Sequence, residues 1–135
     1  MSTLLSRFVV CLEFPVHGPV TAETVRAWID SATEAYLDRC PLLRRPGLLL
    51  RKRPLAHPPA GMLGEPDSVI VSASAAEVHL DSFTLSVRVR SAHDTALNAK
   101  CVVTLADSAT GGPLPVTNEI RDQLIALEHA AEHFN

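Results

Sequence analysis

Three polar side chains near the start of the sequence have the types and positions that hydrolytic chemistry needs. His17 lies in the short segment "PVHGPV", and its imidazole titrates near neutral pH, as suits a general base. Asp30 and Glu34 are four residues apart, so a helix would carry both on one face. A carboxylate against an apolar helix face would have a raised pKa, which also suits a base. A solvent-facing position for His17 and a structural role for Asp30 are the competing interpretations.

Basic residues form a second group that suggests binding chemistry. Five positive charges fall within ten residues, at Arg44, Arg45, Arg51, Lys52 and Arg53. Arg88 and Arg90 would share one face of a strand. Such clusters bind phosphate groups, bidentately in the case of arginine. The competing interpretation is the solvated outer face of a sheet.

The sequence gives no support for metal, cofactor or disulfide chemistry. Cys11, Cys40 and Cys101 lie far apart, without a CxxC pair, and their number is odd. This pattern favours buried thiols in a reducing compartment over a disulfide framework or a zinc site. We therefore expect no metal and no cofactor.

Length and composition predict one ordinary globular domain, 1–135, with a core of its own. The net charge of −3 argues against a general nucleic-acid binder. No stretch approaches the roughly 18 continuous apolar residues of a membrane span. The N-terminal apolar run contains Arg7 and no cleavage site of a signal peptide. We expect a cytoplasmic protein that does not bind membranes.

One long helix is predicted after a first strand over residues 8–16. Thr21 is its predicted N-cap, and Pro41 ends it. Apolar side chains recur at helical spacing, at Val25, Trp28, Ile29, Ala32, Ala35 and Tyr36. Core packing is therefore the expected role of Trp28 and Tyr36.

Four further strands are predicted over residues 48–56, 69–78, 83–90 and 97–106, and a second helix begins near residue 117. The second helix carries one apolar stripe of Ile120, Leu124 and Leu127. Strands joined by short turns pair antiparallel, because parallel pairing needs a long crossover. A single early helix must then bury its apolar stripe on the sheet, so the predicted class is α+β.

This order of elements resembles the hotdog fold, in which a curved antiparallel sheet wraps around one long helix. The residues resemble the family of 4-hydroxybenzoyl-CoA thioesterases and their acyl-CoA thioesterase relatives. The strongest part of the resemblance is the helix, with "GPV" at 18–20, Val25 where the family usually has tyrosine, "WID" at 28–30, Ala32, Tyr36 and Cys40. "PPAGMLGEPDSVIVSASA", "HLDSFTLSVRVRS" and "ALNAKCVVTLADSATGGPLPVTNEIRDQL" are similar to the family's later strands and tail. The resemblance covers nearly the whole chain.

The loop before the helix departs from the family. Its members carry a loop like "DxDxxG" there, and the second aspartate acts as nucleophile or general base on the thioester. In this chain "EF" leads through "PVH" directly to "GPV", so the loop is about three residues shorter and lacks both aspartates. His17 is the residue nearest to the position that the catalytic aspartate has in the family. A second branch of hotdog thioesterases keeps its carboxylate on the helix, where this chain has Asp30 and Glu34.

The resemblance also implies how a thioester would bind. Backbone N–H groups at the helix start, roughly residues 18–23, would face the thioester carbonyl beside Gly18 and Val20. His57 is expected to line the acyl pocket, with a surface or turn-capping role as the alternative. Arg51 and Arg53 are expected to hold the phosphates of coenzyme A or of a carrier protein's pantetheine arm. Such domains pair strand edges into dimers or tetramers, so we expect a homo-oligomer with sites at the subunit boundary.

The expected function is therefore hydrolysis of an acyl-CoA or acyl-carrier-protein thioester with a rearranged catalytic group. The alternative is a non-catalytic hotdog protein that binds an acyl thioester or a protein partner, which the missing aspartate favours directly. A dehydratase or hydratase is disfavoured, because the signature His and Asp loops of those enzymes are absent.

Overall fold

A computed structural model describes residues 8–55, 63, 66–91 and 96–133 of the 135-residue chain. Its elements, in chain order, are β1 (Val10–Pro15), α2 (Ala22–Asp38), the 3₁₀ turn η1 (Pro41–Arg44), β2 (Leu48–Pro54), β3 (Ser68–Val78), β4 (Ser82–Ser91), β5 (Ala96–Asp107), β6 (Pro113–Leu114) and α3 (Asn118–His133). Every strand and helix predicted from the sequence is present among them. The connection predicted between the second and third strands lies mostly outside the described residues.

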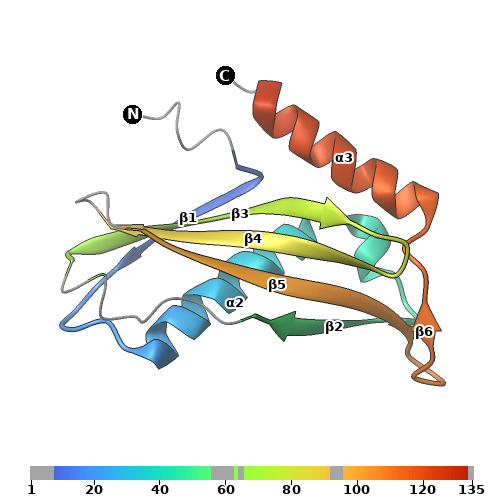
Figure 1. Cartoon of the computed structure of the whole chain (residues 1–135), viewed down its shortest axis with the longest axis horizontal. Helices are drawn as coiled ribbons and strands as arrows, with labels where there is room; N and C mark the ends of the chain where they lie inside the picture. The colour runs from blue at the N-terminus through green and yellow to red at the C-terminus, as the bar shows by residue number, and fades with distance from the viewer. Residues whose placement is uncertain (1–7, 56–62, 64–65, 92–95, 134–135) are drawn as a thin grey trace.

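The strands form one antiparallel sheet in the order β1-β3-β4-β5-β2, and the short β6 pairs with β5. β3, β4 and β5 are consecutive in the chain and in the sheet, while β1 and β2 form its two edges. The sheet curls so that α2 lies on its concave side (Figure 1). The predicted α+β class and the antiparallel pairing are confirmed.

Helix α2 forms where the sequence places it because both of its ends are specified locally. The side-chain oxygen of Thr21 accepts a hydrogen bond from the Thr24 N–H at 3.2 Å, as an N-cap does. The helix ends at Asp38, and Pro41 starts the 3₁₀ turn that leads the chain towards β2. The expected core role of Trp28 is confirmed, since it is 6% exposed and its ring stacks on Phe14 with centroids 6.1 Å apart.

The core lies between α2 and the concave face of the sheet. Alternate residues of the central strands point towards α2, and those with no exposed surface include Val71, Leu85, Val87, Val89 and Val103. The side chains between them point to the outer face. This two-residue alternation is what the sequence showed most clearly in the fourth strand.

Helix α3 covers the part of the sheet that β1 leaves open. β1 begins at Val10, which pairs with Ala73, so among the described residues β3 has no strand partner on that side beyond this point. The Glu128 carboxylate of α3 accepts a hydrogen bond from the Ala75 N–H at 2.8 Å and another from the Tyr36 hydroxyl of α2 at 2.6 Å. Ile120 and Leu124 of the predicted stripe are buried. The C-terminal helix therefore completes the core at this end.

None of the helices in the described part of the chain combines the length and apolar character that a membrane span requires.

Candidate functional site

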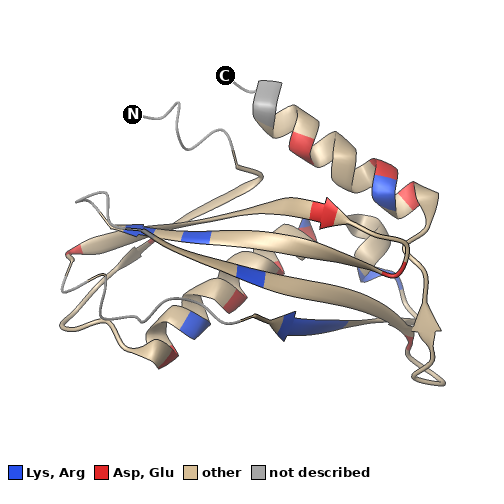
Figure 2. Cartoon of the chain, in the orientation of Figure 1, with Lys and Arg blue, Asp and Glu red and all other residues tan. Residues whose placement is uncertain are grey.

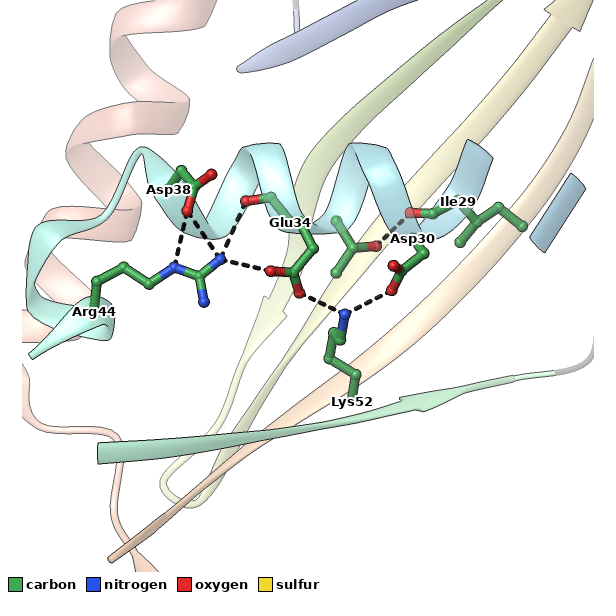
Figure 3. Close-up of polar contacts among 7 residues, drawn as sticks. Ile29, Asp30, Glu34, Asp38, Arg44 and Lys52 are labelled. Carbon is green, nitrogen blue, oxygen red and sulfur yellow. Dashed lines mark hydrogen bonds and ion pairs between the residues drawn. The ribbon is translucent and has the colours of Figure 1, made fainter. Parts of the chain in front are cut away.

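Lys52 links the edge strand β2 to the face of α2 that carries the predicted carboxylates. Successive residues of a strand point to opposite faces, and Lys52 points to the concave side. Its ammonium nitrogen lies 2.6 Å from Asp30 Oδ1 and also donates to Glu34 Oε2 (Figure 3). The structure thus brings Asp30 and Glu34 together, as the sequence predicted, with a cation between them.

The ion pairs continue along α2 towards η1. Arg44 donates to Glu34 Oε1 at 2.8 Å and lies 2.9 Å from the Asp38 carboxylate (Figure 3). The hydrogen bond from Lys52 lowers the pKa of Glu34, against the smaller opposing effect of burial. The sequence-based expectation of a raised pKa is therefore wrong for Glu34, because the packing of β2 supplies cations that the helix alone does not show. Glu34 is better suited to orienting Lys52 than to accepting a proton.

A cavity of about 210 Å³ lies between α2 and the ends of β2 and β5. It is lined by Arg26, Ile29, Asp30, Thr33, Lys52, Pro54, Leu55, Ala99, Lys100 and Cys101. The Thr33 hydroxyl donates to the Ile29 carbonyl at 2.8 Å, and burial raises the pKa of the Cys101 thiol. Neither group is therefore poised as a nucleophile. Asp30, whose side chain is 64% exposed, is the carboxylate of this cavity.

The start of α2 leaves backbone N–H groups without a partner inside the helix. Gly18 has φ of +87°, a left-handed conformation that favours glycine, and it turns the chain into the helix. A Cβ placed there would meet nothing within 4 Å, so Gly18 serves the backbone conformation of the loop. The N–H groups of Ala22 and Glu23, the first two residues of α2, have no acceptor within the helix.

The remaining predicted site residues are dispersed. His17 is exposed in the loop before α2. Asp30 comes eight positions after Ala22, so it lies about 12 Å from the helix start along the axis. Val20 is 8% exposed and belongs to the core. Arg51 and Arg53 point to the outer face of the sheet, away from Asp30. His57 lies outside the described residues.

Sequence reasoning missed the role of Lys52, which it placed in one basic cluster with its neighbours. The alternation in "LLLRKRP" contains the signal, since Leu48, Leu50 and Lys52 share one face of a strand.

Sequence reasoning also missed that His129 and His133 are four residues apart, a spacing used by metal sites. In the part of the chain that the structure describes, no three His, Cys, Asp or Glu side chains are grouped as a metal site.

Comparisons with known proteins agree with this architecture. No protein-family model and no curated protein matches the sequence. A curled antiparallel sheet around one long helix is the hotdog fold, and solved structures confirm that this chain has it.

Three of the solved structures with a similar fold illustrate their similarity to this chain. A thioesterase from Thermus thermophilus, complexed with coenzyme A and Zn, is 20% identical, with a TM-score of 0.69 over 90% of this chain and 96% of that one. A 1,4-dihydroxy-2-naphthoyl-CoA thioesterase from Synechocystis is 14% identical, with a TM-score of 0.64 over 88% and 97%. A 12:0-ACP thioesterase from Umbellularia californica is 12% identical, with a TM-score of 0.66 over 87% and 53%.

Replacing Lys52 with methionine is expected to raise the pKa of Glu34, because the largest cause of its lowering is removed while Arg44 remains. A carboxylate with a lowered pKa in the folded state stabilises the fold above its ordinary pKa, near 4.3, and this contribution is lost as the pH falls through the lowered value. The stability difference between wild type and Lys52→Met should therefore shrink below about pH 4.

Carboxyl-detected NMR titration measures the Glu34 pKa directly, and urea unfolding at several pH values measures the stability. Arg53→Met is the matched control, since Arg53 is the next residue of β2 but points to the outer face. An unchanged Glu34 pKa in Lys52→Met would show that the ion pair does not exist in solution.

Proposed function

We propose that the protein hydrolyses an acyl thioester, with Asp30 as the general base. The observation that carries this proposal is the Asp30 carboxylate in the cavity between α2 and β2, held through one oxygen by Lys52. The other oxygen, Oδ2, has no partner among the hydrogen bonds of the described residues and is left for a water molecule. The hotdog thioesterases that match the structure support the reaction class.

The reaction needs no covalent intermediate. Asp30 takes a proton from a water molecule, whose oxygen forms a bond to the thioester carbon while the carbonyl electrons move to its oxygen. Collapse of this tetrahedral species breaks the C–S bond, and the departing thiolate takes the proton back from Asp30. The products are a carboxylic acid and a free thiol.

The oxyanion requires hydrogen-bond donors close to Asp30. The start of α2 in the same chain cannot supply them, because it lies about 12 Å from Asp30 along the helix axis. We propose that a second copy of the chain supplies them, from the N–H groups at the start of its α2. Pairing of two copies along a free sheet edge, β1 or β2, would form a homodimer with shared sites. Multi-angle light scattering should give twice the chain mass or more, and a folded monomer at micromolar concentration would contradict the shared site.

The thiol carrier is either coenzyme A or an acyl-carrier protein, as in the solved thioesterases that match the fold. A panel of acyl-CoA and acyl-carrier thioesters of varied chain length and aromaticity, monitored by thiol release, tests the function. Release of no thiol from any of them would reject hydrolysis. The free thiols of Cys11, Cys40 and Cys101 also support our proposal of a reducing, cytoplasmic location.

Binding without hydrolysis is the second candidate function. It is favoured by the loop between β1 and α2, residues 16–21, which contains no carboxylate, and by the ion pairing of both helical carboxylates. A non-hydrolytic binder would retain a labelled acyl thioester intact, whereas the enzyme would release free acid. The thiol-release panel therefore separates the two.

A further inference from the structure

Four exposed cations form an oblique stripe across the outer face of the sheet. The stripe consists of Arg88 on β4, Lys100 on β5, and Arg53 and Arg51 on β2. Figure 2 shows this band of basic residues running across β4, β5 and β2. All four side chains are on the face opposite α2, because Lys52, between the two arginines of β2, points towards the helix.

The strand register fixes the spacing of the stripe. Arg88 pairs with Asn98, two residues before Lys100, and Arg53 pairs with Val102, two residues after it. Alternate residues of a strand are about 7 Å apart and neighbouring strands about 4.8 Å, so consecutive cations lie about 7–8 Å apart. The stripe is therefore about 22 Å long, roughly the length of a 15-residue helix.

These cations are not neutralised by ion pairs within the part of the chain that the structure describes. Among the described residues, no ion pair involves any of these four side chains. Arg51 donates a hydrogen bond to the Gly111 carbonyl at 3.3 Å, which leaves its charge unpaired. By contrast, Lys52 and Arg44 on the other side of the sheet are paired with carboxylates. The protein as a whole carries a charge of −3, so the stripe is a local concentration of positive charge.

The surface around the stripe is mostly polar. The side chains beside it on the same face include Ser72, Thr84, Ser86, Asn98, Val102 and Thr104, of which all but Val102 are polar. Such a surface allows a partner to approach the cations closely. Like charges would oppose stacking of this face on the same face of a second copy, since a two-fold interface brings identical patches together.

The chemistry of the face favours an acidic protein over a nucleic acid. Proteins that bind single strands stack bases on aromatic side chains. Among the described residues, the side chains on the outer face of β1 to β5 include no aromatic group. A row of carboxylates along a helix can instead meet four evenly spaced cations by complementary charge.

The stripe also leads to the cavity that contains Asp30. β2 ends at Pro54, and the Leu55 N–H donates to the Lys100 carbonyl at 2.8 Å, so Lys100 lies where the edge strand stops. Lys100 and Leu55 line the 210 Å³ cavity. A partner seated on the stripe could pass a flexible arm around this end of β2 to Asp30.

We propose that the stripe is the docking surface for an acidic acyl-carrier protein, whose thioester arm enters the cavity around the end of β2. This inference rests on the proposed hydrolysis of a thioester and deepens it, because it selects a protein-borne substrate over the coenzyme A ester. Electrostatic docking of this kind raises the association rate and is weakened by salt.

The diagnostic variant is Arg88→Glu, because Arg88 lies on β4, away from the cavity and from Asp30. Arg45→Glu is the matched control, since Arg45 is exposed but lies in the loop before β2. Fluorescence anisotropy with a labelled acyl-carrier protein, at low and moderate salt, should show binding at least tenfold weaker for Arg88→Glu. Adding Arg53→Glu should weaken it further, while Arg45→Glu should bind within twofold of wild type.

Kinetics supply the second readout. For a dodecanoyl group on the carrier protein, kcat/KM should fall at least tenfold in Arg88→Glu, and for dodecanoyl-CoA it should change less than twofold. Equal losses on both substrates, or unchanged carrier binding, would overturn the inference. It would also be overturned if a single-stranded oligonucleotide bound as tightly as the carrier and lost affinity in Arg88→Glu.

The two proposals can fail separately. If wild type binds the carrier through Arg88 but releases no thiol from any substrate, the docking surface stands and the hydrolytic function is rejected. If wild type hydrolyses dodecanoyl-CoA but Arg88→Glu binds the carrier normally, the function stands and the docking surface is rejected.

Discussion

Replacing Asp30 with asparagine is expected to lower kcat for thioester hydrolysis by about 10²- to 10⁴-fold, the usual contribution of a positioned general base. Asparagine has nearly the same shape and can still contact Lys52 through its carbonyl oxygen, but it cannot accept the proton from water. The loss should therefore appear in kcat, with KM little changed, because the substrate still fits the cavity. Steady-state thiol release with the best substrate of the panel measures both constants.

Asp38→Asn is the control for this prediction. Asp38 is also a largely exposed carboxylate of α2 and also pairs with a cation, Arg44, but it does not line the cavity. Its replacement should leave kcat within about twofold. A loss smaller than tenfold in Asp30→Asn, roughly 1.4 kcal/mol of barrier, would show that Asp30 is not the base.

His17→Ala tests another of the three candidate bases named from the sequence. His17 is exposed in the loop before the helix start, and in the proposed mechanism Asp30 is the base, so replacing His17 should have a small effect on kcat. A large loss in His17→Ala together with a small loss in Asp30→Asn would move the catalytic centre to the loop between β1 and α2.

Local patterns were sufficient to predict most of the fold. The apolar spacing after Thr21 defines α2 because a helix must bury one stripe, and the alternation from Phe83 to Arg90 defines β4 because a strand must bury one face. Short connections between β3, β4 and β5 then require antiparallel pairing. These inferences depend on neighbours in the sequence, and that is why they were reliable.

The site was less predictable because its contacts join distant segments. Asp30 and Glu34 could be placed on one helix face, but the cation between them comes from β2, whose position depends on the whole sheet. The predicted direction of the Glu34 pKa shift was wrong for the same reason, since the cations that lower this pKa come from β2 and η1. Arg51 and Arg53 were grouped with Lys52 by sequence distance, although strand geometry separates them to opposite faces of the sheet.

Tyr36→Phe is expected to reduce the free energy of unfolding by about 1.5–3 kcal/mol, the range for a hydrogen bond to a charged group. Tyr36 has no exposed surface, and its hydroxyl donates to Glu128 Oε2 at 2.6 Å. Burial and the neighbouring Glu128 carboxylate both raise the pKa of Tyr36, so the hydroxyl remains a donor throughout the usable pH range. Urea unfolding followed by circular dichroism measures the loss.

The same hydroxyl orients the carboxylate that holds α3 on the sheet, because Glu128 Oε2 also accepts from the Ala75 N–H where β1 no longer covers β3. Tyr36→Phe should therefore speed hydrogen exchange in α3 more than in β4. Ile125→Ala is the control on the same helix, since Ile125 is 54% exposed, and it should cost less than about 0.5 kcal/mol.

A double-mutant cycle of Tyr36→Phe with Glu128→Gln separates this contact from general damage to the core. Glutamine keeps a carbonyl oxygen for the Ala75 N–H but carries no charge, so it should weaken the bond to Tyr36 and leave the backbone contact. Because the two residues share one hydrogen bond, the summed losses of unfolding free energy in the two single variants should exceed the loss in the double variant. Strict additivity, or a loss below 0.5 kcal/mol in Tyr36→Phe, would mean that apolar packing of Ile120 and Leu124 alone holds α3 in place.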